Sequence, residues 1–272
     1  MNKLLNHNPK RIFTFGCSFT NYKWPTWANI LAYDLDIPLY NYGKSGAGNQ
    51  FIFNSLMQAD YYYKFDKNDL VIICWTNVCR EDRRIENQWV TGGNIWTNSY
   101  YDDKFLKKYA DALGYAVRDF ALIKASWEIL DKRKVSSHFL KMLDFEYVDQ
   151  WNHTAKLYNA DELFAIYKVY LDKIYKSFYE ILWSNDLNKK REMDFKNIDD
   201  KFIDGHPTVI EHYTYLEKIF DHKFKSQTKD IVYKTQDALV NSIKKQLLKK
   251  IKPNDMDFKE IFFSQSKFIR LF

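Results

Sequence analysis

The chain has 272 residues, of which 46% are hydrophobic and 28% charged, a composition typical of a folded protein with one large domain or a domain and an appendage. Its net charge of +6 does not by itself indicate nucleic-acid binding. No stretch of about 18 apolar residues is present and the first ten residues lack a signal-peptide core, so we expect neither a membrane span nor secretion. The three cysteines, Cys17, Cys74 and Cys79, show neither pairing nor metal spacing, which favours free thiols and a cytoplasmic protein.

Short apolar runs alternate with amphipathic stretches along the first half of the chain. The run at 69–75 is almost continuously apolar, as expected for a central parallel strand that is covered on both faces. Strands that alternate with helices in this way predict an α/β fold with right-handed crossovers. The predicted strands are 11–15, 38–42, 69–75 and 137–143, and the predicted helices are 24–35, 49–65 and 109–132.

The second half of the chain is less regular. Residues 80–108 are polar and contain several Trp and Tyr, so we interpret them as an insertion near the strand ends. Helices are predicted at 161–183, with Leu163 and Ile166 on its apolar face, and at 209–224, with a polar loop at 184–203 between them.

The last fifty residues are basic and amphipathic. Ile231, Leu239, Ile243, Leu247 and Ile251 can share one face of a helix, with Lys244, Lys245, Lys249 and Lys250 between them. The simpler interpretation is a helix that packs on the main domain and keeps its lysines in water, and the alternative is contact with an anionic membrane or glycan. We therefore divide the chain into a main domain, 1–222, and a helical C-terminal extension, 223–272.

Ser18 follows the first predicted strand in the segment Gly16-Cys17-Ser18-Phe19. A serine on a turn from strand to helix has its hydroxyl at the end of the sheet and close to the N–H groups that open the helix, where negative charge is favoured. This is the setting that a nucleophilic serine needs. The alternative is that Ser18 and Thr20 only cap the helix, as Ser and Thr often do.

Three further polar segments follow later strands or loops. Gly43 to Asn49 come after the second strand, and glycines there allow a close approach of the backbone to a ligand. Asn77 follows the third strand, where its amide either donates to a developing oxyanion or caps a turn. His206 stands in Asp204-Gly205-His206-Pro207, and a histidine beside a carboxylate is the base-and-orienter pair that a serine nucleophile requires. Ligands of open parallel sheets bind outside the carboxyl ends of the strands, so we expect these segments to meet.

In this order the four segments resemble the conserved blocks of the SGNH/GDSL hydrolase family, over about residues 11–222. The chain departs from the family pattern at Cys17, where Asp is usual, at Trp75, where Gly is usual, and in the spacing of Asp204 and His206, which is one residue shorter. The resemblance implies a flavodoxin-like, three-layer α/β/α fold with a central parallel sheet. The segments that carry it are Gly16-Cys17-Ser18-Phe19, Gly43 to Asn49, Trp75-Thr76-Asn77 and Asp204-Gly205-His206-Pro207.

The resemblance also implies a reaction, acyl transfer from an ester, with Ser18 as nucleophile and His206 as base. Asp204 is the implied orienting group, and Asp200 or a backbone carbonyl are alternatives for that role. The implied oxyanion donors are the N–H groups of Ser18 and Gly46 and the side chain of Asn77. Neither a metal nor an organic cofactor is needed.

The position of each residue in its segment decides between candidate glycines and between candidate nucleophiles. Gly46 is preferred to Gly43 and Gly48, because the glycine of the family follows a short polar stretch after the second strand. A thiol nucleophile at Cys17 is a competing idea, but a residue just before the apex of the turn is expected to point into the core.

The expected substrate is a small molecule or glycan that carries a short acyl ester, in particular O-acetyl on a carbohydrate. Aromatic residues of the insertion can line a sugar pocket, and a signal for a long apolar cleft is lacking. An O-acyltransferase that uses the same residues with a glycan acceptor, and a non-catalytic binding protein on this fold, are the alternatives. The aromatic residues of the insertion are Trp89, Trp96, Tyr100 and Tyr101.

Overall fold

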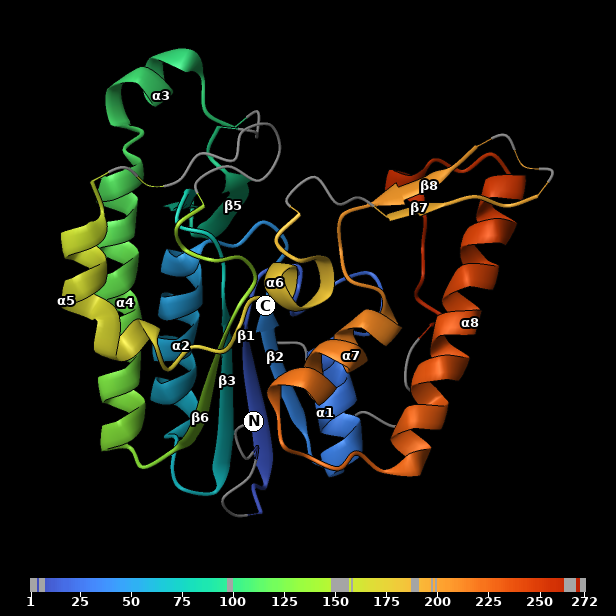
Figure 1. Cartoon of the computed structure of the whole chain (residues 1–272), viewed down its shortest axis with the longest axis horizontal. Helices are drawn as coiled ribbons and strands as arrows, with labels where there is room; N and C mark the ends of the chain where they lie inside the picture. Colours follow the sequence, from blue (N-terminus) through green and yellow to red (C-terminus); the bar gives the residue numbers. More distant parts are fainter. Residues whose placement is uncertain are drawn as a thin grey trace.

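A parallel sheet of five strands forms the centre of the molecule, in the order β6-β3-β1-β2-β9 (Figure 1). The computed structural model describes residues 4, 8–96, 100–147, 157, 159–186, 191–196, 198, 200–261 and 268–269. Every residue of β3 is buried, as its apolar run predicts. The strands are β1 (Arg11–Gly16), β2 (Leu39–Gly43), β3 (Asp69–Trp75), β6 (Ser136–Lys141) and β9 (Phe268–Ile269).

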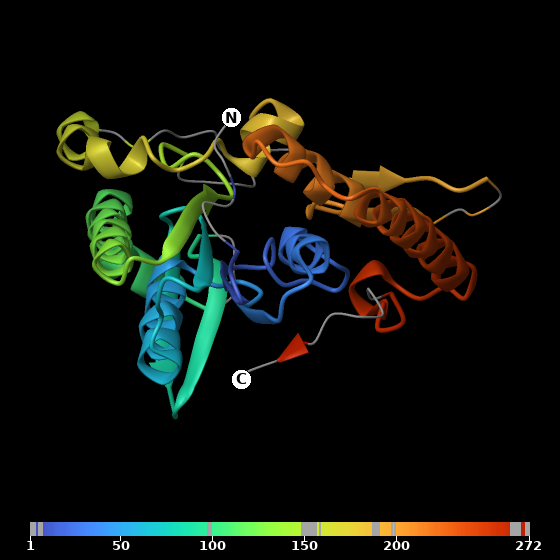
Figure 2. The same cartoon turned by 90° about the horizontal axis from the view of Figure 1, so that it is seen from below.

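Helices cover both faces of this sheet, so the architecture is the predicted three-layer α/β/α arrangement (Figures 1 and 2). One layer contains α2 (Asn49–Tyr63) and α4 (Ala112–Lys132), and α5 (Asp161–Leu171) packs on α4. The other contains α1 (Trp27–Leu35) and α7 (Val209–Ile219), against which α6 (Phe178–Trp183) and α8 (Ser226–Leu248) pack. Right-handed crossovers from β1 to β2 and from β2 to β3 run in opposite directions, which places α1 and α2 on opposite faces.

The register of the strands brings their carboxyl ends to one edge of the sheet. Gly16 at the end of β1 lies opposite Gly43 at the end of β2, and Phe15 lies opposite Ile73 of β3. The segments that follow β1, β2 and β3 therefore leave the sheet side by side. These are the segments that contain Ser18, Gly46 and Asn77.

Helix α1 begins at Trp27, three residues later than the predicted start at Trp24. Proline disfavours helical geometry in the residue before it, so Pro25 keeps Trp24 outside the helix. Thr26 is the N-cap.

The segment 80–108 is more regular than predicted. It forms an antiparallel hairpin of β4 (Arg80–Ile85) and β5 (Gln88–Asn94), followed by α3 (Asp103–Tyr109). Glu86 and Asn87, at the tip, both have positive φ, at 47° and 65°, the geometry of a two-residue hairpin turn. Figure 1 shows β5 and α3 beyond the edge where the core strands end.

The single helix predicted at 161–183 is wrong, because the chain forms α5 and α6 instead. Ser177 caps α6 by accepting from the N–H of Glu180, and the N–H of Tyr175 donates to Phe139 of β6. Ile166, expected on the buried face, is 63% exposed. The loop predicted at 184–203 contains a short hairpin of β7 (Arg191–Met193) and β8 (Phe202–Asp204).

The C-terminal helix α8 packs on α1 and α7, as the simpler interpretation predicts. Leu239, Ile243 and Leu247 are buried, while the four lysines between and beyond them are exposed. Asp34 of α1 fastens the start of the helix by accepting from Lys225 N at 2.9 Å and Thr228 Oγ1 at 2.6 Å. A 3₁₀ turn (Pro253–Asp255) follows α8, and β9 was not predicted.

The helices and the cysteines bear on the predictions about membranes and disulfides. Within the described residues, none of the helices combines the length and the apolar character that crossing a bilayer requires. Cys17, Cys74 and Cys79 are all buried, and none of the three is joined in a disulfide.

Candidate active site

Ser18 lies in a tight turn directly after β1. The N–H of Thr20 donates to the carbonyl of Cys17 at 2.9 Å. A side chain at Gly16 would place its Cβ 2.1 Å from Thr20 Oγ1, so this turn requires glycine. Because the N-cap of α1 is Thr26, the alternative that Ser18 and Thr20 only cap this helix is wrong.

His206 joins Ser18 to Asp204. His206 Nε2 lies 2.9 Å from Ser18 Oγ, and His206 Nδ1 lies 2.8 Å from Asp204 Oδ1. A carboxylate accepts hydrogen bonds only, so Nδ1 carries the proton and Nε2 is free to accept from the serine hydroxyl. The structure therefore brings the three residues into the contacts of a Ser-His-Asp triad.

The short spacing between Asp204 and His206 is compatible with this contact. Asp204 Oδ1 accepts from the backbone N–H of His206 at 2.7 Å as well as from its ring, so one carboxylate oxygen fixes both the loop and the imidazole. Trp24 Nε1 donates to the carbonyl of Pro207 at 2.9 Å and holds the other side of the loop. Asp200, the alternative orienting residue, is exposed.

Asp204 is poised to remain ionised. Burial acts to raise the pKa of this carboxyl, but the hydrogen bonds from the ring and backbone of His206 and their electrostatic interaction, with a smaller contribution from Tyr22, outweigh burial and lower the pKa below its ordinary value. An ionised Asp204 holds the Nδ1–H tautomer of His206 and stabilises the imidazolium that forms when His206 takes a proton.

Tyr22 is a site residue that the sequence analysis missed. Its hydroxyl donates to Asp204 Oδ2 at 2.8 Å, and its ring stacks on His206 with the centroids 3.8 Å apart and 20° between the planes. Tyr22, four residues after Ser18, thus contacts both His206 and Asp204. The only signal in the sequence is its position four residues after Ser18, and nothing there shows that the histidine loop packs against it.

Gly46 lies in the turn between β2 and α2 with φ at +74°, a conformation that favours glycine. Its two alternatives have their backbone N–H groups in use: Gly43 donates to Asn41 Oδ1 at 2.9 Å, and Gly48 donates to Asp82 Oδ1 at 2.8 Å. Within the described chain no acceptor takes the N–H of Gly46. That N–H is therefore the one of the three without an acceptor among the described residues.

Asn77 is fully buried two residues beyond β3, and neither its amide nitrogen nor its amide oxygen has a hydrogen-bond partner among the described residues. Leaving a buried amide unpaired costs about 1–3 kcal/mol, which a structural cap would avoid. The unpaired amide argues against the alternative that Asn77 caps a turn and fits a donor reserved for a ligand.

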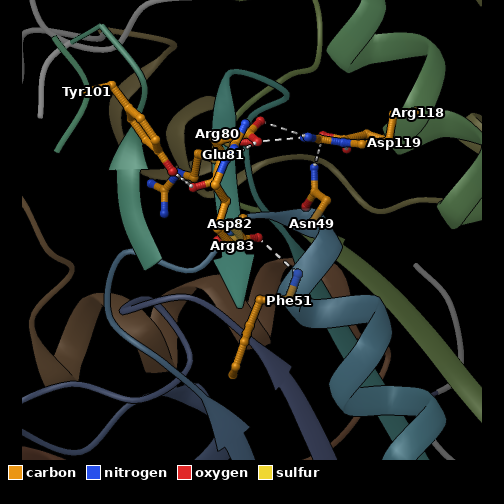
Figure 3. A network of polar contacts seen from close by, with 10 residues as sticks. Asn49, Phe51, Arg80, Glu81, Asp82, Arg83, Tyr101, Arg118 and Asp119 are labelled. Atoms are coloured by element: carbon orange, nitrogen blue, oxygen red, sulfur yellow. Dashed lines mark hydrogen bonds and ion pairs between the residues drawn. The ribbon is translucent and has the colours of Figure 1, made fainter. Parts of the chain in front are cut away.

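Strand β4 supports the loop of Gly46 and the start of α2 (Figure 3). Arg80 Nη1 donates to the carbonyl of Ala47 at 2.8 Å, and Asp82 accepts from the N–H groups of Gly48 and Phe51 at 2.8 and 2.9 Å. Burial raises the pKa of Asp82 although both N–H groups favour its charged form. The alternation of Arg80 and Asp82 on one face of β4 was a signal for this strand.

Strand β5, which pairs with β4, holds the same loop. Gly93 N donates to the carbonyl of Gly46 at 2.9 Å, and Lys44 Nζ donates to the carbonyl of Trp89 at 2.7 Å. A side chain at Gly46 would place its Cβ 2.3 Å from the carbonyl oxygen of Thr91. The hairpin and the candidate oxyanion loop therefore form one unit.

The thiol of Cys17 is the competing nucleophile. Cys17 is fully buried with Sγ 3.8 Å from Met142 Sδ, so its thiol lies in the core, as expected. Among the residues that the structure describes, no cluster of three His, Cys, Asp or Glu side chains could hold a metal ion.

Comparison with solved structures finds proteins of similar architecture at low identity. A mutant of Axe2, an acetyl-xylooligosaccharide esterase from Geobacillus Stearmophilus, is 12% identical with a TM-score of 0.44, over 82% of this chain and 100% of that one. A GDSL-like lipase from Bacteroides thetaiotaomicron is 13% identical with a TM-score of 0.41, over 84% of this chain and 92% of that one. A member of the lipolytic protein G-D-S-L family from Veillonella parvula is 14% identical with a TM-score of 0.39, over 76% of this chain and 96% of that one.

No family model and no curated protein matches this sequence. At the identities and TM-scores of the solved structures, the likeness assigns no activity to this chain. The functional conclusion therefore depends on the geometry around Ser18.

Proposed function

We propose that this chain is a serine ester hydrolase of the SGNH/GDSL type that cleaves a short acyl ester through an acyl-enzyme. The observation that carries the proposal is the pair of contacts of His206, 2.9 Å to Ser18 Oγ and 2.8 Å to Asp204 Oδ1. A binding protein has no need of a serine hydroxyl in contact with an imidazole that a carboxylate orients.

The first half of the reaction makes the acyl-enzyme. Ser18 Oγ attacks the ester carbonyl while His206 Nε2 takes its proton, and Asp204 stabilises the resulting imidazolium. The oxyanion of the tetrahedral intermediate accepts from Gly46 N–H, the amide of Asn77 and the N–H of Ser18. The intermediate then collapses, the ester bond breaks, and His206 gives its proton to the leaving alcohol.

The second half regenerates the serine. Water enters the position of the alcohol and His206 Nε2 takes a proton from it as its oxygen attacks the acyl carbonyl. The same donors hold the second oxyanion. Collapse releases the carboxylic acid and returns the proton from His206 to Ser18 Oγ.

We propose a carbohydrate as the alcohol, with acetyl as the acyl group. The hairpin that holds the Gly46 loop also carries Trp89 and leads to Trp96, which is 38% exposed. Aromatic side chains beside a hydrolytic centre offer flat apolar faces against which a sugar ring can pack. Trp89 contacts Phe51 edge-on, at 5.7 Å between centroids, a contact that favours this orientation of its ring.

The test is acetate release from acetylated xylo-oligosaccharides, together with hydrolysis of p-nitrophenyl esters of increasing acyl length. We expect acetate release and a preference for acetyl over long acyl chains, with Ser18→Ala reducing kcat at least about 10³-fold. Cys17→Ala is the control and is expected to keep the activity, because its thiol is in the core. Full activity of Ser18→Ala would contradict the serine mechanism, and a preference for long-chain lipid esters would contradict the carbohydrate assignment.

A further inference from the structure

The side chain of Asn77 has no hydrogen-bond partner among the described residues that fixes its direction. Its nitrogen and oxygen are both buried and both unpaired. An oxyanion donor has to be held where charge develops before the substrate arrives, because donors that must reorganise lose most of their effect. The direction of Asn77 therefore depends on the backbone that carries it.

Asn49 holds that backbone at the preceding residue, Thr76. Asn49 Oδ1 accepts from Thr76 N at 2.9 Å, and Asn49 Nδ2 donates to the carbonyl of Thr76 at 3.1 Å. Both backbone groups of Thr76 are thus bound by one side chain, in the way a neighbouring strand would bind them. Asn49 and Thr76 are fully buried, so water does not compete for these bonds.

Asp119 of α4 anchors Asn49 in turn (Figure 3). Asn49 Nδ2 also donates to Asp119 Oδ2 at 2.8 Å, and Arg118 Nε donates to Asp119 Oδ1 at 2.7 Å. With one carboxylate oxygen on Arg118 and the other on Asn49, the amide of Asn49 cannot flip without leaving a buried donor or acceptor unpaired.

The side chain of Asn49 is not needed to start α2. The N-cap of that helix is Gly48, and Asp82 takes the N–H groups of Gly48 and Phe51. Asn49 is also three residues after Gly46, directly behind the turn that presents the other candidate donor. One residue therefore joins the two loops whose relative placement determines the shape of the oxyanion site.

We propose that Asn49, anchored by Asp119, is the positioning residue of the oxyanion site and sets the direction of the Asn77 amide through the backbone of Thr76. This inference rests on the proposed function of the site. Asn49 does not touch the substrate, so its contribution passes through Asn77 and disappears when Asn77 is absent.

A double-mutant cycle in the full-length chain tests this with an acetyl ester. Removing one oxyanion donor costs about 10²–10³-fold in kcat, and a misplaced donor costs part of that, so we expect Asn49→Ala to lower kcat about 10-fold to 100-fold with little change in KM. In the Asn77→Ala background the same change is expected to cost less than about twofold. Equal losses in the two backgrounds would overturn the proposal, because a general structural defect acts whether or not Asn77 is present.

Asn49→Ser is the second variant, because it keeps a small polar side chain if Asn49→Ala folds poorly. Thr228→Val is the matched control, since it removes a buried hydrogen bond to a carboxylate, 2.6 Å from Thr228 Oγ1 to Asp34 Oδ1, between α1 and α8. We expect the control to lose stability and keep kcat. A loss of kcat in Thr228→Val similar to that in Asn49→Ser would overturn the proposal.

Hydrogen exchange followed by mass spectrometry gives a readout that does not need activity. We expect Asn49→Ser to speed exchange in the peptide that contains Thr76 and Asn77 and to leave the peptide of β1 unchanged. Unchanged exchange at Thr76 would overturn the positional role. A wild-type chain that hydrolyses no ester would instead overturn the proposed function, and the exchange result would then still decide whether Asn49 holds this backbone.

Discussion

Replacing Tyr22 by Phe removes one hydroxyl group from behind the candidate triad and keeps the ring that stacks on His206. That hydroxyl donates to Asp204 Oδ2 at 2.8 Å, whereas both contacts of His206 are made to the other carboxylate oxygen. Tyr22→Phe therefore removes one hydrogen bond that holds the Asp204 carboxylate and leaves the hydrogen bond between Asp204 and the imidazole in place.

The size of the effect follows from these contacts. A hydrogen bond to a charged acceptor contributes about 1.5–3 kcal/mol. The side chain of Asp204 is 16% exposed, so water replaces part of the lost bond and we expect a cost of about 1 kcal/mol, or roughly fivefold in kcat/KM. The Tyr22 bond also helps to lower the pKa of Asp204, so its loss moves that pKa upward.

The assay is kcat/KM for an acetyl ester between pH 4 and pH 8, with the melting temperature measured alongside. Tyr215→Phe is the matched control, because it removes a buried tyrosine hydroxyl that donates to the carbonyl of Lys176 at 2.7 Å, outside the triad. Tyr22→Leu also removes the stacked ring, worth about 0.5–1.5 kcal/mol, and is expected to lose up to about tenfold more.

The reasoning is refuted if Tyr22→Phe keeps full kcat/KM across this pH range, or if Tyr215→Phe loses as much activity as Tyr22→Phe. In the first case Asp204 does not depend on Tyr22. In the second, any lost tyrosine hydroxyl would act through stability alone.

Three further predictions concern the oxyanion loop and the buried network. Gly46→Ala is expected to lose activity and stability together, since φ is +74° and the new Cβ would lie 2.3 Å from the carbonyl oxygen of Thr91; an active, equally stable variant would show that this loop is not constrained. Asn77→Ala is expected to lower kcat about 10²–10³-fold with an unchanged melting temperature, and an unchanged kcat would remove Asn77 from the site. Burial raises the pKa of Asp119 from 3.8 to about 6, although Arg118 opposes the shift. The native state therefore binds the proton of the Asp119 carboxyl more tightly than the unfolded chain does. This contribution to stability is complete in acid and is lost as the pH rises from about 4 to 6. Denaturant titrations should therefore show wild-type stability, relative to Asp119→Asn, falling by about 3 kcal/mol over that range; a constant difference would contradict the raised pKa.

The core of the fold was accessible from the sequence because parallel strands and their crossovers leave a strong local signal. The run at 69–75 matches β3 residue for residue, and the segments of Ser18, Gly46 and Asn77 follow three adjacent strands as expected. Their common edge is a consequence of parallel topology, which periodicity alone predicts.

The errors arose where tertiary contacts override periodicity. The apolar periodicity of 161–183 predicts one helix, but the structure has two. Ser177 caps the second helix, α6, and the N–H of Tyr175 donates to the carbonyl of Phe139 instead of continuing α5. The hairpin at 80–94 has little apolar alternation, because Arg80 and Asp82 face buried backbone groups rather than a hydrophobic core.

The residues that the sequence analysis missed at the site act through distant partners. Tyr22 meets Asp204 from a position 182 residues earlier in the chain, and Asn49 meets Asp119 from a position 70 residues earlier. No local pattern distinguishes such a tyrosine or asparagine from an ordinary surface or capping residue, so only the assembled fold reveals them.

The central claim is that His206 activates Ser18 as a nucleophile, and active-site labelling tests it most directly. The folded wild-type protein is treated with a small fluorophosphonate, and the modified residue is located by peptide mass spectrometry. We predict one label per chain, on Ser18, with labelling abolished by unfolding and slowed at least about 10³-fold in His206→Ala. Absence of labelling in folded wild-type protein, or equal labelling of the His206→Ala variant, would contradict the claim.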